Sequence, residues 1–221
     1  MAETANLSIR GCNSHPGLLV ANQYMDRSKI DLLELPIGFF GKVCLYLVMA
    51  GQKPAAEIFS HESVKNESGK IRDFLKRERL FFRTITIYDT KDEKTGSRLY
   101  LVSQSPLLVL QLKRIWNARK WGTKQHHLKH GLLVGFPRGA VWAYANTIEN
   151  KEEFTKVMLS TKTAHGKFDK EPWGAYLTYV VRRGYEEKDV KTAKRWAKTV
   201  RDEFPKLASE FEKWAKTTEQ F

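Results

Sequence analysis

The spacing of apolar residues predicts a chain that is mostly helical, with one β-hairpin near its centre. Residues 81–88 alternate aromatic and β-branched side chains, which is typical of a strand; 98–103 would be its return strand and 89–96 the charged tip between them. A further short strand is expected at 17–21. Apolar residues recur at a helical period over residues 37–50, 71–80, 107–121, 126–133, 138–146, 151–159, 186–201 and 205–216. The pattern therefore indicates an α+β fold, predominantly helical, with a central β-hairpin or small antiparallel sheet.

Capping residues delimit several of these helices. Gly51 and Gly122 follow two of the apolar segments, as glycine does at helix C-termini. Ser105 and Pro106 are residue types preferred at an N-cap and at the first helical position. Asn150 is followed within one turn by two glutamates, which favours a helix start there. The last two helices share one apolar stripe, formed by Val190, Ala193, Trp196, Ala197, Val200, Phe204, Leu207, Phe211 and Trp214.

The order of elements in the first half is similar to that of a winged helix-turn-helix. We expect an α+β lobe over 1–104, ending in the hairpin, and a helical lobe over 105–221 with the basic surface; the two can also form one compact domain. In the first lobe, 39–50, 54–59 and 70–79 would supply a helix, a short helix and a helix, and the hairpin would be the wing. A winged-helix domain reads DNA with its third helix. Six acidic residues in the same region weaken such a surface.

Positive charge is concentrated in the middle of the chain. The protein has 38 Lys and Arg against 25 Asp and Glu, which gives a formal net charge of +13. Residues 94–148 contain no acid, and residues 111–140 alone carry +7. A field of this sign attracts phosphates or carboxylates. Some of these cations would also complement a helix C-terminus, but the glutamates that normally accompany lysine on a solvated helix are missing.

Aromatic residues accompany these charges, and the combination suits nucleic acid. Lys and Arg follow the phosphate backbone while exposed rings stack on bases, most readily in single strands. Trp121, beside Gly122, is the expected stacking platform, whereas Trp116 shares a helix face with Leu108 and Leu112 and is expected in the core. The predicted nucleic-acid or phosphate-binding residues are Lys113, Arg114, Arg119, Lys120, Trp121, Lys124, His126, His127, Lys129, His130 and Arg138.

The three clustered histidines among these residues are candidate metal ligands. His126 and His130 share one face of a helix, as zinc-binding pairs do. No cysteine or carboxylate lies near them in the sequence to complete the ligand set. We therefore predict no metal and no other cofactor, and we assign the histidines to phosphate or ribose contact. One of them could act as a general acid or base near a bound phosphate.

Residues 131–137, with the sequence GLLVGFP, form the most motif-like segment. Two glycines and a proline around apolar residues specify a close backbone approach before a helix. This suits either anion binding at the helix N-terminus or a tight packing turn. The segment resembles the pattern H-x-x-x-G-x-L-x-G-[FY]-P of an uncharacterised archaeal protein family through His127, Gly131, Leu133, Gly135, Phe136 and Pro137. A cysteine pair follows in that family, where Gly139 and Ala140 stand here, and the resemblance implies no particular activity.

The sequence favours a nucleic-acid-binding protein, RNA over DNA, that uses the basic, aromatic-containing surface of 94–148. Its partner would be a nucleic acid or a ribonucleoprotein, and an acidic protein partner fits the charge equally well. One alternative is a winged-helix DNA-binding regulator. Another is an enzyme acting on a phosphorylated small molecule or an RNA end. That enzyme would surround its substrate with Lys124, His127, His130 and Arg138, and would take its acids from outside the window, for example from Glu149, Asp169 or Glu171.

The sequence predicts a cytoplasmic protein with no membrane partner. The longest apolar run, 43–50, is too short to span a bilayer. The first eight residues lack the basic start and apolar stretch of a signal peptide. The two cysteines, Cys12 and Cys44, belong to no disulfide framework, as is usual in a reducing compartment.

Overall fold

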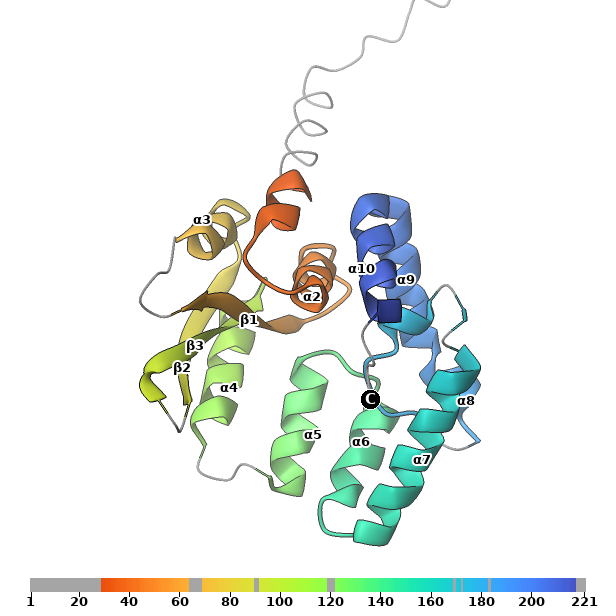
Figure 1. Cartoon of the computed structure of the whole chain (residues 1–221). Helices are drawn as coiled ribbons and strands as arrows, with labels where there is room; N and C mark the ends of the chain where they lie inside the picture. Colours follow the sequence, from red (N-terminus) through yellow and green to blue (C-terminus); the bar gives the residue numbers. More distant parts are fainter. Residues whose placement is uncertain are drawn as a thin grey trace, which may run out of the picture.

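The computed structural model describes residues 29–63, 69–89, 92–118, 122–168, 170–171, 173–182 and 184–217. It is predominantly helical with a small antiparallel sheet, which confirms the predicted fold class (Figure 1). After a helical turn at 29–34, the elements are α2 (Phe39–Met49), β1 (Ala55–Ser63), α3 (Lys70–Arg77), β2 (Phe81–Asp89), β3 (Asp92–Ser103), α4 (Pro106–Asn117), α5 (Lys124–Leu133), α6 (Arg138–Thr147), α7 (Lys151–Phe168), the 3₁₀ helix η1 (Gly174–Tyr176), α8 (Glu186–Asp189), α9 (Lys191–Glu203) and α10 (Pro205–Thr217).

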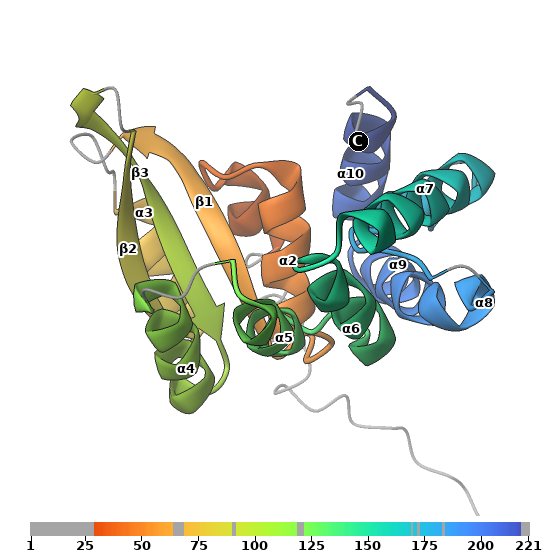
Figure 2. The same cartoon turned by 90° about the horizontal axis from the view of Figure 1, so that it is seen from below.

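The three strands pair in the order β1-β3-β2, all antiparallel, and both faces of the sheet are covered by helices. Alternate residues of a strand point to opposite faces. Leu99 and Leu101 of β3 therefore pack with Val109 and Leu112 of α4. Tyr100, between them, packs on the other face with the core formed by α2 and α3. Figure 2 shows α4 and α5 in front of the sheet and α2 to one side.

The short helix expected at 54–59 is wrong, because these residues form most of strand β1. Ala56 and Ile58 are buried on one face, and the strand pairs with β3 so that Glu57 lies opposite Leu101. Cross-strand pairing and burial have thus overridden the helix propensity of alanine and glutamate. Within the described residues, α2 is followed by strand β1 and then by α3. The winged-helix interpretation required a short helix in place of β1, so the described residues do not form its helix-turn-helix. The strand predicted at 17–21 lies outside the described residues.

Local start and stop signals place most of the helices correctly. Gly51 follows α2 with a φ of 68°, and the Asn150 side chain accepts a hydrogen bond from the Glu153 amide (3.1 Å) at the start of α7. Ser105 takes the N-cap position of α4, as predicted. Other boundaries differ from the prediction: α3 ends at Arg77, β3 begins at Asp92 within the expected hairpin tip, α4 ends at Asn117, α7 continues to Phe168, and the helix expected at 186–201 is divided into α8 and α9.

Helix α2 lies at the centre of the core, between the sheet and the pair α9–α10 (Figure 1). All its residues from Lys42 to Val48 are buried, as expected for a helix that is apolar on every side. The predicted stripe of α9 and α10 packs against it, with Trp196 and Phe211 almost fully buried. Lys42 reaches past Phe39 to donate a hydrogen bond to the Leu33 carbonyl oxygen. Within the described part of the chain, no helix combines the length and apolar character needed to cross a bilayer.

Candidate functional site

Helices α4, α5 and α6 lie side by side and carry the described cations that were predicted from the sequence. The exposed ones are Arg114 on α4, Lys129 on α5 and Arg138 at the start of α6, whereas Lys113 and Lys124 are half-buried. Arg119, Lys120 and Trp121 lie outside the described residues. Trp116 packs beside the core under α4, as its helical period predicted. The described cations are therefore spread along three neighbouring helices.

The three histidine rings of α5 contact other side chains of the protein. His126 is 6% exposed and stacks on His130 at a centroid distance of 6.1 Å. His127 lies edge-on to Tyr144 of α6, with ring centroids 5.3 Å apart. Burial lowers the pKa of His126 and of His127, and the neighbouring histidines lower both further. Both rings are thus biased towards the neutral form, which has no charge to offer a phosphate.

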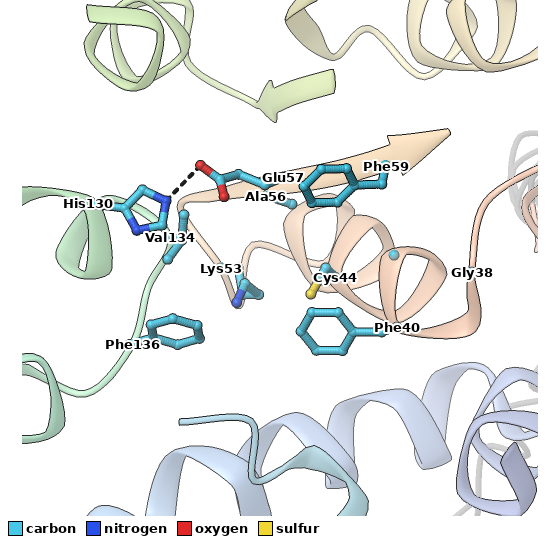
Figure 3. Close-up of a pocket in the computed structure, with 11 residues that line it drawn as sticks. Gly38, Phe40, Cys44, Lys53, Ala56, Glu57, Phe59, His130, Val134 and Phe136 are labelled. Carbon is cyan, nitrogen blue, oxygen red and sulfur yellow. Dashed lines mark hydrogen bonds and ion pairs between the residues drawn. The ribbon is translucent and has the colours of Figure 1, made fainter. Parts of the chain in front are cut away.

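A cavity of about 280 Å³ opens between α2, β1 and the end of α5 (Figure 3). We call it the α2–β1 cavity. Most of its wall is apolar, and Figure 3 shows Phe40 and Phe59 at one end and Phe136 at the other. The complete set of lining residues is Gly38, Phe40, Gly41, Cys44, Lys53, Ala56, Glu57, Phe59, His130, Val134 and Phe136. The cavity therefore combines apolar walls with a thiol, an amine, a carboxylate and an imidazole.

Lys53 is held inside the protein by the turn that ends α2. Gly51 adopts a left-handed conformation, and the amides of Gln52 and Lys53 both donate to the Leu47 carbonyl oxygen (2.8 and 3.0 Å). This turn directs the Lys53 side chain inward, where it is 4% exposed. Its Nζ lies 4.3 Å from the ring centroid of Trp196 and 4.9 Å from that of Phe136. Burial lowers the pKa of Lys53 and raises the pKa of the Cys44 thiol.

Glu57 forms the second polar group of the cavity together with His130. Its Oε1 lies 2.7 Å from His130 Nε2 and accepts a hydrogen bond from Trp116 Nε1 (2.6 Å). A carboxylate that holds one ring nitrogen fixes the orientation of an imidazole. This arrangement is the one that acid–base chemistry requires, provided a substrate reaches the imidazole.

A larger hollow, of about 1320 Å³, runs between α6, α7 and the segment around α8. We call it the α6–α7 groove. Its wall contains the cations Arg138, Lys156, Lys167, Arg182 and Lys188, and the acids Glu153, Glu186 and Asp189. Trp142 and Tyr185 also line it, and they are 43% and 54% exposed. Arg138 is the only residue of the predicted binding set in this wall among the described residues.

Arg182 is fixed in the groove wall by a buried partner. Its Nε and Nη2 donate to the two carboxylate oxygens of Asp189 (2.9 and 2.6 Å), and its guanidinium stacks on Tyr185 at 4.5 Å. A Cβ at Gly139 would lie 2.3 Å from Arg182 Cζ, so the absence of a side chain at Gly139 lets the guanidinium rest against the first turn of α6. This pairing raises the pKa of Arg182.

The glycines of the motif-like segment serve packing. A Cβ at Gly131 would lie 2.8 Å from Val141 Cγ2, so glycine lets α5 and α6 approach closely. Gly135 has a φ of 83°, and its Cβ would lie 2.6 Å from Pro54 Cδ. Of the two interpretations of this segment, these contacts favour the tight packing turn.

The two hollows divide the residues that the enzyme hypothesis grouped together. His130 lines the α2–β1 cavity, whereas Arg138 lines the α6–α7 groove. The acid beside His130 is Glu57 rather than Glu149 or Glu171, which are both exposed. Asp169 lies outside the described residues. Lys53 and Glu57 were not among the predicted site residues because both are distant in sequence from the histidines. The sequence feature that could have pointed to Lys53 is its position just after the glycine that ends a buried helix.

Among the described residues, no group of three or more His, Cys, Asp or Glu side chains is arranged to hold a metal ion. No protein-family model, curated protein or solved structure matches the chain at a significant level.

Proposed function

We propose that this protein binds single-stranded nucleic acid, RNA in preference to DNA, along the α6–α7 groove and the adjacent acid-free helices. One observation carries the proposal: the exposed rings of Trp142 and Tyr185 line the same groove as Arg138, Lys167 and Lys188. Rings that stack on bases and cations that follow phosphates are the two components of single-strand recognition. Stacking on unpaired bases is also how most RNA-binding modules read their ligands.

The size of the groove favours a polymer over a small molecule. Small-molecule pockets enclose about 300–1,000 Å³ and bury most of their ligand. The groove measures about 1320 Å³, and helices rather than loops form its two long walls. An extended strand can lie along such a groove with part of each nucleotide exposed to solvent.

Three of the groove cations are available for phosphates. Lys156 pairs with Glu152 (2.7 Å) and Arg182 with Asp189, so their charges are already compensated. Among the described residues, Arg138, Lys167 and Lys188 form no ion pair with an acid. Each phosphate contact on a single strand contributes about −0.7 to the slope of log K against log salt, so the groove alone gives a slope of about −2. The cations of α4 and α5 would steepen it.

Fluorescence-anisotropy titrations with single-stranded RNA, duplex RNA and duplex DNA over a salt series test this proposal. We expect micromolar or tighter binding to single-stranded RNA near physiological salt, weaker binding to both duplexes, and a slope of −2 or steeper. Equal, weak binding to all three that vanishes at modest salt contradicts the proposal. An acidic protein partner would then fit the charge better.

Paired variants locate the interface. Trp142→Ala removes a stacking platform and should weaken RNA binding by about 1–3 kcal/mol, roughly 5- to 150-fold. Arg138→Ala should weaken it less and reduce the salt slope by about 0.7. Lys206→Ala and Lys213→Ala remove exposed cations from α10 and serve as the charge-matched controls. Equal losses in the groove variants and in these controls would show that binding depends on net charge alone.

A further inference from the structure

Lys53 is a buried amine in the wall of the α2–β1 cavity. It is 4% exposed, and within the described part of the chain no carboxylate forms an ion pair with it. Its Nζ lies over the rings of Trp196 and Phe136, 4.3 and 4.9 Å from their centroids. Cation–π contact offsets only part of the cost of removing an ammonium from water. Burial therefore disfavours the charged ammonium form and lowers the pKa of Lys53, an effect that the Glu57 carboxylate partly opposes.

A neutral lysine amine is a nucleophile, and Lys53 is the strongest one in the cavity wall. Desolvation in an apolar pocket is the usual way in which a lysine is activated for attack on a carbonyl carbon. The other candidate, Cys44, is fully buried, and burial raises the pKa of its thiol, which keeps it in the unreactive protonated form.

The rest of the α2–β1 cavity fits an uncharged carbonyl compound. Its volume of about 280 Å³ is at the lower end for small-molecule sites, and Phe40, Phe59 and Val134 give it apolar walls. Glu57 also lines it, so an anionic ligand would meet a carboxylate. His130 provides a proton donor and acceptor in the same wall and is held by Glu57 at 2.7 Å.

We propose that Lys53 forms an imine with a small apolar aldehyde or ketone bound in the α2–β1 cavity, with His130 as the acid–base group. The Nζ lone pair forms a bond to the carbonyl carbon, the C=O π bond breaks towards oxygen, and one proton passes from the nitrogen to that oxygen, which gives a neutral carbinolamine. His130 protonates the hydroxyl group, water leaves, and the nitrogen loses its second proton as the C=N bond forms. The two hydrogens of the amine thus leave with the carbonyl oxygen as one water molecule. This reaction uses none of the groove residues and goes beyond nucleic-acid binding.

Reductive trapping tests the proposal on the full-length protein. Benzaldehyde and sodium cyanoborohydride convert an imine into a stable benzylamine, which peptide mass mapping assigns to one residue. We expect Lys53 to be benzylated at least tenfold faster at neutral pH than the exposed Lys206, whose amine is solvated. In urea this preference should disappear. If Lys53 is labelled no faster than Lys206, the proposal is wrong. This result is obtained with the unmodified protein, so it does not depend on the folding of any variant.

Variants separate imine formation from simple accessibility. Lys53→Met should abolish the fast label and leave labelling of Lys206 unchanged. His130→Gln should slow the label at Lys53 several-fold without changing that at Lys206; an unchanged rate would remove His130 from the reaction. RNA binding by Lys53→Met should equal that of the unmodified protein, so failure of the imine proposal and failure of the proposed function are distinguishable.

Discussion

The carboxylate of Glu57 on β1 and the imidazole of His130 on α5 lie 2.7 Å apart, although the residues are separated by 73 positions in the chain. The same carboxylate oxygen accepts the indole N–H of Trp116 from α4. Glu57 therefore connects the sheet to both α4 and α5. It also lines the α2–β1 cavity, so it lies between that cavity and the two basic helices. A disturbance of Glu57 should affect both.

Trp116→Phe tests the contribution of this connection to stability. Phenylalanine keeps an aromatic ring against β1 but removes the donor that lies 2.6 Å from Glu57 Oε1. We expect the free energy of unfolding to fall by about 1.5–3 kcal/mol, because hydrogen bonds to charged groups contribute about that much. Urea denaturation measures it. Trp142→Phe, at an exposed tryptophan, is the control and should change stability by less than about 0.5 kcal/mol. Equal effects of the two substitutions would contradict the assigned role of Trp116.

Features set by neighbouring residues were predictable from the sequence. Asn150 caps α7 as its pattern indicated, and the helical period of α4 correctly placed Trp116 towards the core. Gly135 and Pro137 marked the break between α5 and α6 because a positive φ and a proline ring each act on the chain locally. Signals of this kind need no knowledge of the tertiary structure.

Features set by distant partners were not predictable. Residues 55–59 form a strand because β3 pairs with them, and their partners lie 40 to 48 residues further along the chain. Glu57 counted in the sequence only as one more negative charge, since its two partners come from α4 and α5. Lys53 carries the same charge in the sequence as an exposed lysine, and only the packing of Trp196 and Phe136 around it sets it apart.

The close approach of α5 and α6 can be tested with two glycine-to-alanine substitutions. Gly131→Ala places a methyl group 2.8 Å from buried Val141, and the resulting overpacking should lower the free energy of unfolding by about 1–3 kcal/mol. Gly166→Ala on α7 meets nothing within 4 Å, so the helix propensity of alanine should raise stability by about 0.5–1 kcal/mol. Chemical denaturation of both variants measures the difference. Stabilisation by Gly131→Ala would mean that the two helices pack less closely than the structure shows.

Stability should decrease as the pH falls from 7.5 to 5.5. Burial lowers the folded-state pKa of His126 and His127 below the ordinary value of 6.5, so the unfolded chain takes up protons first. The two neutral histidines contribute their full stabilisation at pH values above the unfolded-state pKa. This contribution is lost as the pH falls through that pKa towards the lower folded-state pKa, because the unfolded chain is protonated first. Urea denaturation across this range measures the slope, and the variant with both residues changed to Gln should show a smaller one. NMR titration of the two rings should give midpoints below 6.5; midpoints above it would reverse the expected slope.

Asp189→Asn should lower the free energy of unfolding more than substitution of an exposed charge does. Asp189 is 2% exposed and accepts hydrogen bonds from the backbone amide, Nε and Nη2 of Arg182. Breaking a buried ion pair costs about 3–5 kcal/mol, and because Arg182 remains partly exposed we expect about 2–3 kcal/mol in urea denaturation. Glu187→Gln, at an exposed acid of the same helix, removes the same charge and should cost less than about 0.5 kcal/mol.

The released guanidinium of Arg182 would also no longer be held against Gly139, so RNA affinity should change in Asp189→Asn and not in Glu187→Gln. Stability loss without any change in RNA affinity would separate this ion pair from the proposed binding surface.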